Sequence, residues 1–215
     1  GEEMVPRQQT AGMLGMLAGL SLAVLFVVYI TSGASPQTFA DPAKALPYVT
    51  ENAARLRAIA VLAAVTVVLA TFFVAGLAGR LRERAPTRAT GVLYFGLLGI
   101  AGHGLGALVW WGAVPAVVAR AAMDQVAASH AWVATNALSI ALDGFGNLFT
   151  GLTILLAGWA LVAGGASALG WYGVVAGILT ALTTIIPGST ALVVGSFVLP
   201  VIFLLWAGSW LRTAR

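Results

Sequence analysis

Long apolar runs dominate the chain, and short polar or Pro/Gly-rich stretches separate them. A membrane-spanning helix needs about 20 predominantly apolar residues. Six stretches meet this requirement: residues 11–31, 59–79, 91–114, 131–161, 169–186 and 191–211. The runs are continuous, whereas lipid-facing barrel strands alternate apolar and polar residues. Because backbone groups in hydrocarbon must hydrogen-bond internally, the pattern predicts an all-α polytopic membrane protein, a single domain over residues 1–215 with six transmembrane helices in one bundle.

The polar stretches predict where the helices begin and end. Residues 80–88 form a charged turn, and residues 164–167 and 187–189 form short Gly-containing turns. The connection over residues 115–130 is long enough for a short interfacial helix. Ser129 is a candidate N-cap of the fourth helix, which would leave His130 exposed at the helix end.

Residues 32–54 form the other long connection. Pro47 suits the first turn of a helix, and no helix breaker follows it before the apolar run. We therefore predict that the second helix begins near Pro47. Asn52, Arg55 and Arg57 would then lie at the outer interface, where the arginines reach head groups or a ligand carboxylate.

Composition supports the membrane assignment. Apolar residues make up 60% of the chain and charged residues only 8%, against about a quarter in soluble domains. Mean hydropathy is +0.97. These values exclude a soluble nucleic-acid-binding domain, a coiled coil and a disordered chain. The chain has no cysteine, which excludes disulfides, thiolate metal sites and iron–sulfur clusters.

The basic residues predict the orientation. With the N-terminus in the cytoplasm, seven arginines fall on the cytoplasmic side and four basic residues on the other. The positive-inside rule therefore favours both termini inside, in the inner (cytoplasmic) membrane. Aromatic residues that anchor helices at the two interfaces fit this orientation, with Trp110, Trp111 and Trp132 outside and Trp159, Trp171, Tyr172, Trp206 and Trp210 inside.

Two ionisable residues lie deep within apolar runs, and such residues are functional candidates because charge in lipid is costly. His103 lies eleven residues below Val114, and Asp143 lies twelve residues below Ala131, so both are about 17 to 18 Å from the outer ends of their runs. The runs are consecutive and antiparallel. We therefore predict that the two side chains lie near the membrane midplane, within reach of each other.

The fourth run also carries a polar stripe. Asn136, Asp143, Asn147 and Thr150 are spaced seven, four and three residues apart, which places them within about 60° of one another on a helix. This face predicts a ligand site or proton relay, together with His103, that points into the bundle. Interhelical hydrogen bonding that only fixes packing is the alternative. Ligation of a porphyrin- or chlorophyll-type ring by His103 is a third hypothesis.

Glycine pairs at i, i+4 spacing predict close helix packing. The pairs are Gly15/Gly19, Gly102/Gly106 and Gly173/Gly177. Packing within the chain explains all of them, and a dimer seam is an alternative for the pair on the first helix.

The chain lacks the patterns of hydrolytic and metal-dependent enzymes. It has no nucleophile on a recognisable elbow, no paired carboxylates, no zinc-protease spacing and no phosphate loop. We therefore predict no catalytic residue, no metal site and no cofactor. The expected partners are the lipid bilayer and either another membrane protein or a second copy of the chain.

Five segments resemble a bacterial family of six-helix integral membrane proteins catalogued as a domain of unknown function. The likeness covers nearly the whole chain and is carried by residues 11–19, 51–57, 144–152, 169–173 and 206–212. The resemblance implies a fold and no particular activity.

The six-span layout also resembles the substrate-binding subunits of energy-coupling-factor vitamin transporters. That resemblance implies binding from the outside and docking through small residues of the first helix. We therefore interpret the chain as a non-enzymatic membrane protein that binds a small molecule or takes part in transport. A structural or accessory subunit of a larger membrane complex is the alternative.

The predicted orientation can be tested with topology reporters. Green fluorescent protein fused after Arg215 is expected to fluoresce, and alkaline phosphatase at the same position is expected to be inactive, because the basic residues hold this end in the cytoplasm. Phosphatase inserted between residues 115 and 130 is the matched control and is expected to be active. The opposite pattern would reverse the orientation.

Overall fold

The computed structural model describes residues 4–33, 35–186 and 190–213, and no strand occurs in them. Six helical stretches are long and apolar enough to cross a membrane, which confirms the predicted all-α fold. The helices are α1 (Met4–Thr31), α2 (Pro36–Ala40), α3 (Pro42–Glu51), α4 (Ala53–Leu81), α5 (Pro86–Leu108), the π-helical segment η1 (Val109–Ala113), α6 (Val114–Ala121), α7 (Gln125–Ala163), α8 (Ser167–Ile185) and α9 (Thr190–Thr213). The predicted turn at residues 187–189 lies outside the described residues.

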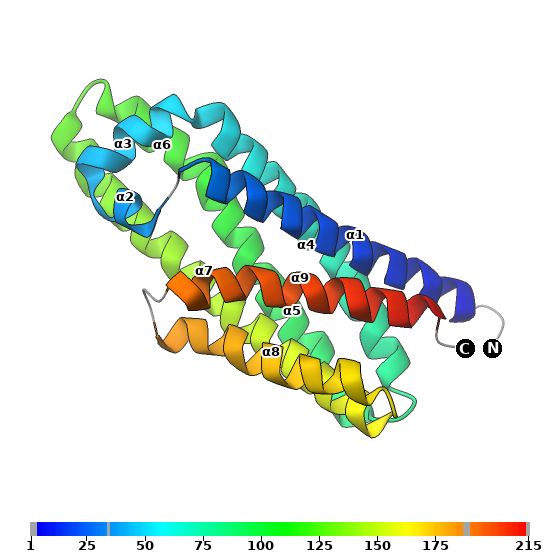
Figure 1. Ribbon diagram of the computed structural model, residues 1–215. Coiled ribbons are helices and arrows are strands. Elements are labelled where there is room, and N and C mark those ends of the chain that lie inside the picture. Colours follow the sequence, from blue (N-terminus) through cyan, green and yellow to red (C-terminus); the bar gives the residue numbers. More distant parts are fainter. Residues whose placement is uncertain (1–3, 34, 187–189, 214–215) are drawn as a thin grey trace.

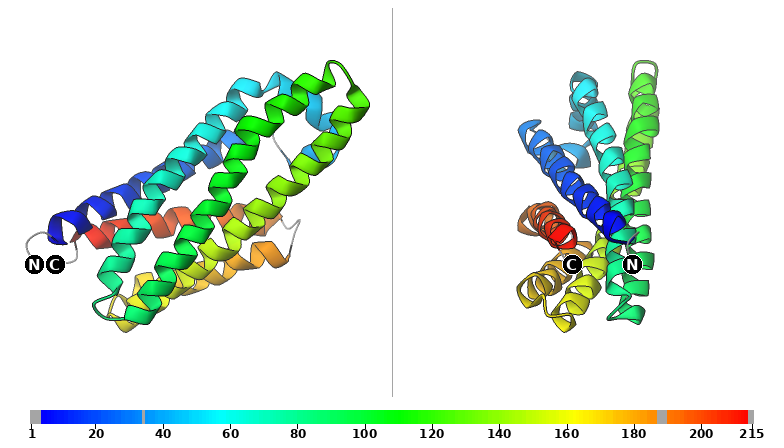
Figure 2. Two further views of the ribbon diagram at one scale, coloured as in Figure 1. Left: turned by 180° about the vertical axis from the view of Figure 1, so that it is seen from behind. Right: turned by 90° about the vertical axis from the view of Figure 1, so that its right-hand side faces the viewer.

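The six long helices form a closed ring in which each packs mainly on two neighbours, in the order α1, α4, α5, α7, α8, α9 and back to α1. At one end of the bundle α1 begins, α9 ends, and short connections join α4 to α5 and α7 to α8 (Figure 1). We call this the charged-loop end, after Arg80, Arg82, Glu83, Arg84 and Arg88. Helices α2, α3 and α6 gather at the other end, the capped end, as the view from behind also shows (Figure 2).

Each end has its own apolar core. The larger core lies toward the charged-loop end and includes Phe73, Leu77, Ile154, Phe203 and Leu211, from α4, α7 and α9. The smaller core lies at the capped end, where α2, α3, α6 and the start of α7 meet around Phe39, Leu46, Val49, Val117 and Trp132. The capped end is therefore a packed unit and not a pair of loose loops.

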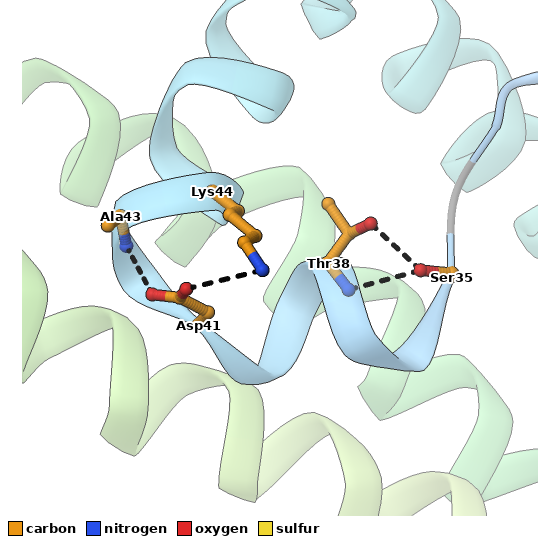
Figure 3. Close-up of polar contacts among 5 residues, drawn as sticks. All are labelled: Ser35, Thr38, Asp41, Ala43 and Lys44. Atoms are coloured by element: carbon orange, nitrogen blue, oxygen red, sulfur yellow. Dashed lines mark hydrogen bonds and ion pairs between the residues drawn. The ribbon is translucent and has the colours of Figure 1, made fainter.

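Local capping explains why the connection after α1 folds into two short helices. The Ser35 hydroxyl accepts a hydrogen bond from the Thr38 N–H at 3.1 Å, and the Asp41 carboxylate accepts one from the Ala43 N–H at 3.0 Å (Figure 3). Each cap is followed by a proline at the first helical position, where its missing N–H costs nothing. Lys44 pairs with Asp41 at 3.8 Å.

The predicted start of the second helix is wrong in one respect. Pro47 lies inside α3, which begins five residues earlier at Pro42 because Asp41 caps it. Residues 48–56 are helical as predicted, except at Asn52, where α3 ends and α4 begins. The Asn52 side chain donates to the Tyr48 carbonyl at 2.9 Å. This bond supplies a donor to a carbonyl of the last turn of α3, where the helix ends.

The connection between the third and fourth spans contains the predicted short helix, α6, but the N-cap of α7 is Asp124 and not Ser129. The Ala127 N–H donates to the Asp124 carboxylate at 3.0 Å, and this bond holds the pKa of Asp124 below its ordinary value. Ser129 lies inside the helix and donates to the Gln125 carbonyl at 2.9 Å. His130 is exposed, as predicted.

The aromatic residues divide into two groups. Trp159, Trp171 and Trp206 are exposed, at 54%, 60% and 43%, as expected of anchors in a bilayer interface. Trp132 is only 1% exposed, so the prediction that it anchors the outer interface is wrong. Its indole N–H donates to the Phe39 carbonyl at 2.9 Å, which ties α7 to α2.

Glycines let neighbouring helices approach until their backbones touch. A Cβ atom on Gly158 of α7 would lie 2.6 Å from the Gly170 carbonyl oxygen of α8, and one on Gly173 would lie 2.9 Å from the Gly158 Cα. Gly177 meets the backbone of α7 at Leu155 in the same way. Such contacts occur in membrane bundles because dispersion and shape, not water exclusion, drive association there.

Gly15 and Gly19 also pack within the chain. A Cβ atom on Gly15 would overlap the ring of Phe73 on α4, and one on Gly19 would lie 3.0 Å from Leu205 on α9. Both positions therefore serve the contacts of α1 with its two ring neighbours. This packing contradicts the alternative of a dimer seam at these glycines.

The glycine contacts predict a clear pair of variants. Gly158→Ala is expected to lower the free energy of unfolding by about 1 to 3 kcal/mol, because α7 and α8 must move apart to fit the methyl group. The control is Gly79→Ala, since nothing lies within 4 Å of a Cβ atom there. Thermal unfolding in detergent measures both. Equal melting temperatures would show that α7 and α8 tolerate separation.

Candidate functional site

The site centres on His103 of α5 and Asp143 of α7. The imidazole Nδ1 lies 4.0 Å from the carboxylate Oδ1, so the predicted proximity is confirmed. This separation is an ion-pair distance and too long for a direct hydrogen bond. The two groups therefore face each other across a space that a small polar group can bridge.

Glycines on the opposite helix make room for both side chains. A Cβ atom on Gly146 of α7 would lie 2.7 Å from the His103 ring, and one on Gly106 of α5 would lie 3.0 Å from the Asp143 Oδ1. Gly102 completes the contact, because a Cβ atom there would lie 2.8 Å from the Gly146 Cα. Each polar side chain thus lies over a glycine of the partner helix, and the predicted packing role of Gly102 and Gly106 is part of the site.

The other residues of the polar stripe have different surroundings. The Thr150 hydroxyl lies 3.4 Å from the His103 Nε2, so Thr150 joins the pair. Asn136 donates to the Phe39 carbonyl at 3.3 Å and thereby serves the capped end. Asn147 is half-buried. Asp143 and Thr150 of the stripe therefore face the two ring nitrogens of His103, at 4.0 and 3.4 Å.

The stripe faces the interior of the helix ring. Ile154 follows Asp143 by eleven residues, which places it within about 20° of Asp143 on α7. Ile154 is 4% exposed and packs in the core with Phe73 of α4 and Phe203 of α9, across the ring. Phe145 points in nearly the opposite direction and is 41% exposed on the outside of the bundle.

The pair remains accessible although it faces inward. The side chains of His103 and Asp143 are 37% and 57% exposed, whereas Ile154 on the same face is almost fully buried. The interior of the ring is therefore filled toward the charged-loop end and open around Asp143. This difference separates Asp143 from the packing residues of α7.

The lengths of the helices locate the pair along the bundle. Twenty residues of α7 separate Asp143 from Ala163 at the charged-loop end, a distance of about 30 Å. The Thr184 hydroxyl, in the last turn of α8, donates to the Gly144 carbonyl at 2.8 Å. The pair therefore lies level with the end of α8, and its depth near the membrane midplane stays a prediction.

An aromatic cluster lies directly beyond the pair at the capped end. The Trp110 indole N–H donates to the Ser139 hydroxyl at 3.0 Å, and Ser139 precedes Asp143 by about one helical turn. The Trp110 ring meets Phe39 edge-on at 5.3 Å and Trp132 at 6.1 Å. Ser139 lies on the edge of the predicted polar stripe, and neither Ser139 nor Phe39 was predicted as a site residue. Phe39 carries no signal for this role, because α2 has only five residues.

A π-helical segment places Trp110 in this cluster. Segment η1 directly follows α5 and begins six residues after His103. Single π turns inside α-helices are frequent at functional sites, because they rotate the residues beyond them. Here the rotation turns Trp110 toward Ser139, while Trp111 stays 54% exposed.

Arg55 and Arg57 lie apart from the pair. Both are exposed in the first turns of α4, which follow Asn52 at the capped end. Among the described residues, neither arginine forms an ion pair or hydrogen bond with His103 or Asp143. The interface role of Asn52, Arg55 and Arg57 stays a prediction.

Porphyrin ligation by His103 gains no geometric support. Nε2 faces Thr150 at 3.4 Å, Nδ1 faces Asp143 at 4.0 Å, and the ring lies against Gly146. A macrocycle that bound either nitrogen would have to part α5 from α7.

Comparisons with known proteins agree with the resemblance seen in the sequence. The model of the family described as "Domain of unknown function (DUF4386)" matches residues 17–212. No curated protein and no solved structure matches the chain. The likeness to vitamin-transporter subunits therefore remains an inference from layout alone.

The contact between His103 and Gly146 predicts a change that leaves all charges in place. Gly146→Ala is expected to displace the imidazole from Thr150, because the new methyl group would lie 2.7 Å from the ring. The ¹⁵N resonances of His103 in histidine-labelled protein should shift. Gly144→Ala is the control, since its methyl group would meet only Thr184 at an ordinary 3.6 Å. Unchanged resonances in Gly146→Ala would contradict the observed packing.

Proposed function

The chain belongs to the DUF4386 family and has the helices of a multi-pass membrane protein, and we propose that it is a non-enzymatic protein that binds a small molecule between α5 and α7. The observation that carries the proposal is the exposure of Asp143. Its side chain is 57% exposed although it faces the inside of the ring. A carboxylate used only for packing would be enclosed by hydrogen-bond donors.

The geometry suits binding better than catalysis. The pair offers one carboxylate and one imidazole on rigid helices, and no described group of three or more His, Cys, Asp or Glu side chains could hold a metal ion. Polar side chains on an inward face of a membrane helix typically line substrate or ion pathways. The aromatic cluster beyond the pair adds the apolar surface that ligand sites require.

The proposed orientation gives the site a direction. If the charged-loop end faces the cytoplasm, as the basic residues favour, the capped end and the pair face the outer side of the inner membrane. A ligand would then reach Asp143 from outside through the capped end. Transport would require a conformational change that opens the core around Phe73 and Ile154. Binding alone requires no such change.

Access to the site can be measured with single cysteines, because the chain contains none. Asp143→Cys and Asn147→Cys are expected to react with a charged, membrane-impermeant thiol reagent added at the capped end of the protein in vesicles. Phe145→Cys is the matched control. It lies on the same helix and is also exposed, at 41%, but it faces lipid. We expect it to react at least about tenfold more slowly, because the charged reagent cannot enter hydrocarbon.

The same experiment addresses the accessory-subunit alternative. If both inward-facing cysteines are as inert as Phe145→Cys, the interior is closed and the binding proposal fails. The polar stripe would then serve packing, and a structural role in a larger complex would be the better explanation.

A further inference from the structure

The carboxylate of Asp143 lacks the arginine or lysine partner that three other carboxylates of the described residues have. Asp41 pairs with Lys44 at 3.8 Å, Glu83 with Arg80 at 2.9 Å, and Asp124 with Arg120 at 3.3 Å. Asp143 faces only the His103 imidazole, at 4.0 Å, which is charged only when protonated. Within residues 4–33, 35–186 and 190–213, no hydrogen-bond donor is assigned to Asp143.

Such a carboxylate favours a cationic ligand. It faces the interior of a ring of membrane-spanning helices, where a charge is stabilised less than in bulk water. A cation that donates hydrogen bonds compensates this cost, because charge-assisted bonds are stronger than neutral ones. An anion would meet the carboxylate as a like charge.

The surroundings distinguish an amine from a metal ion. The Asn147 amide oxygen follows Asp143 by about one turn on the same stripe and adds a hydrogen-bond acceptor. A metal ion would find a single carboxylate, since the described residues hold no cluster of ligating side chains. An ammonium group needs only two or three acceptors around it, which the two carboxylate oxygens of Asp143 and the Asn147 amide can supply.

Aromatic side chains beside the pair suit the apolar part of such a ligand. Tyr29 of α1 stacks on Phe197 of α9, with ring centroids 6.2 Å apart. The indole N–H of Trp110 donates to the hydroxyl of Ser139, which precedes Asp143 by about one turn of α7. Aromatic faces attract cations and apolar groups alike.

We propose, on the basis of the binding function above, that the site takes a protonated amine attached to an apolar or aromatic body. The ammonium group binds Asp143 in the space between the carboxylate and His103. The apolar body extends toward Trp110 and the capped end. Gly106 and Gly146 make room for the two polar side chains, because a Cβ atom there would lie 3.0 Å from the Asp143 carboxylate and 2.7 Å from the His103 ring.

The test compares three probes of similar shape and different charge. Benzylamine is a cation at neutral pH, benzyl alcohol is neutral and benzoate is an anion. Calorimetric titration of the wild-type protein in lipid nanodiscs is expected to show benzylamine binding at least about tenfold more tightly than benzyl alcohol, as a charge-assisted bond implies. Benzoate should bind more weakly than either probe.

Asp143→Asn assigns the preference to this carboxylate. The amide keeps the shape and removes the charge, so the difference between benzylamine and benzyl alcohol should disappear. The melting temperature should change little, because no hydrogen bond to the carboxylate is lost. Asp41→Asn is the matched control, since asparagine also caps helices well, and it should retain the wild-type preference.

The outcomes distinguish failure of the amine proposal from failure of the proposed binding function. Equal affinity of the wild type for benzylamine and benzyl alcohol, or a preference that survives in Asp143→Asn, would overturn the amine proposal. The cysteine reactivity of Asp143→Cys would still support a binding site in that case. If Asp143→Asn does not fold, Gly106→Ala replaces it. Its methyl group would lie 3.0 Å from the carboxylate oxygen, and unchanged benzylamine affinity there would count against the proposal.

Discussion

Backbone contact between α7 and its two neighbours is the constraint on which the rest of the structure depends. Gly146 lets α5 approach on one side, and Gly158 lets α8 approach on the other. A bundle in lipid gains no hydrophobic energy from association, so close packing must hold it together. The positions of α5 and α8 on α7 follow from these glycines, and the remaining helices close the ring around them. The polar pair lies beside the contact of Gly102 on α5 with Gly146 on α7.

The unequal lengths of the helices then divide the molecule into two parts. Helix α8 has 19 residues, about enough to cross the hydrocarbon, whereas α7 has 39. The surplus of α7 projects beyond the end of α8 and packs with α2, α3 and α6 around Trp132. The candidate site lies at the level where the shorter helices stop. At this level α8 no longer packs on α7, and the packing with α2, α3 and α6 begins.

The sequence predicted the six spans because continuous apolar runs leave the backbone few alternatives to a helix. It also predicted that His103 lies near Asp143. Both positions were counted from run ends that lie together at the capped end, so equal counts placed the two side chains at one level. The contact of Trp132 with Phe39 was missed because it joins residues 93 positions apart, through a helix too short to show periodicity. Asp41 followed by Pro42 is the sequence pattern of a capped helix start. The prediction placed the start at Pro47 because that proline is also compatible with a first turn.

The π-helical segment between α5 and α6 sets the register between the two parts of the molecule. A π turn holds one residue more than an α turn, so the residues beyond Val109 are rotated relative to a continuous α-helix by about 100°. Loss of a single residue from η1 would restore α geometry and turn Trp110 away from Ser139, without altering any residue of the membrane-embedded half. One-residue deletions and insertions within η1 therefore rotate the helices of the capped end relative to the long helices of the bundle. Substitutions there change only individual contacts. A change of length in this segment therefore alters the surroundings of Asp143 on the side of the capped end.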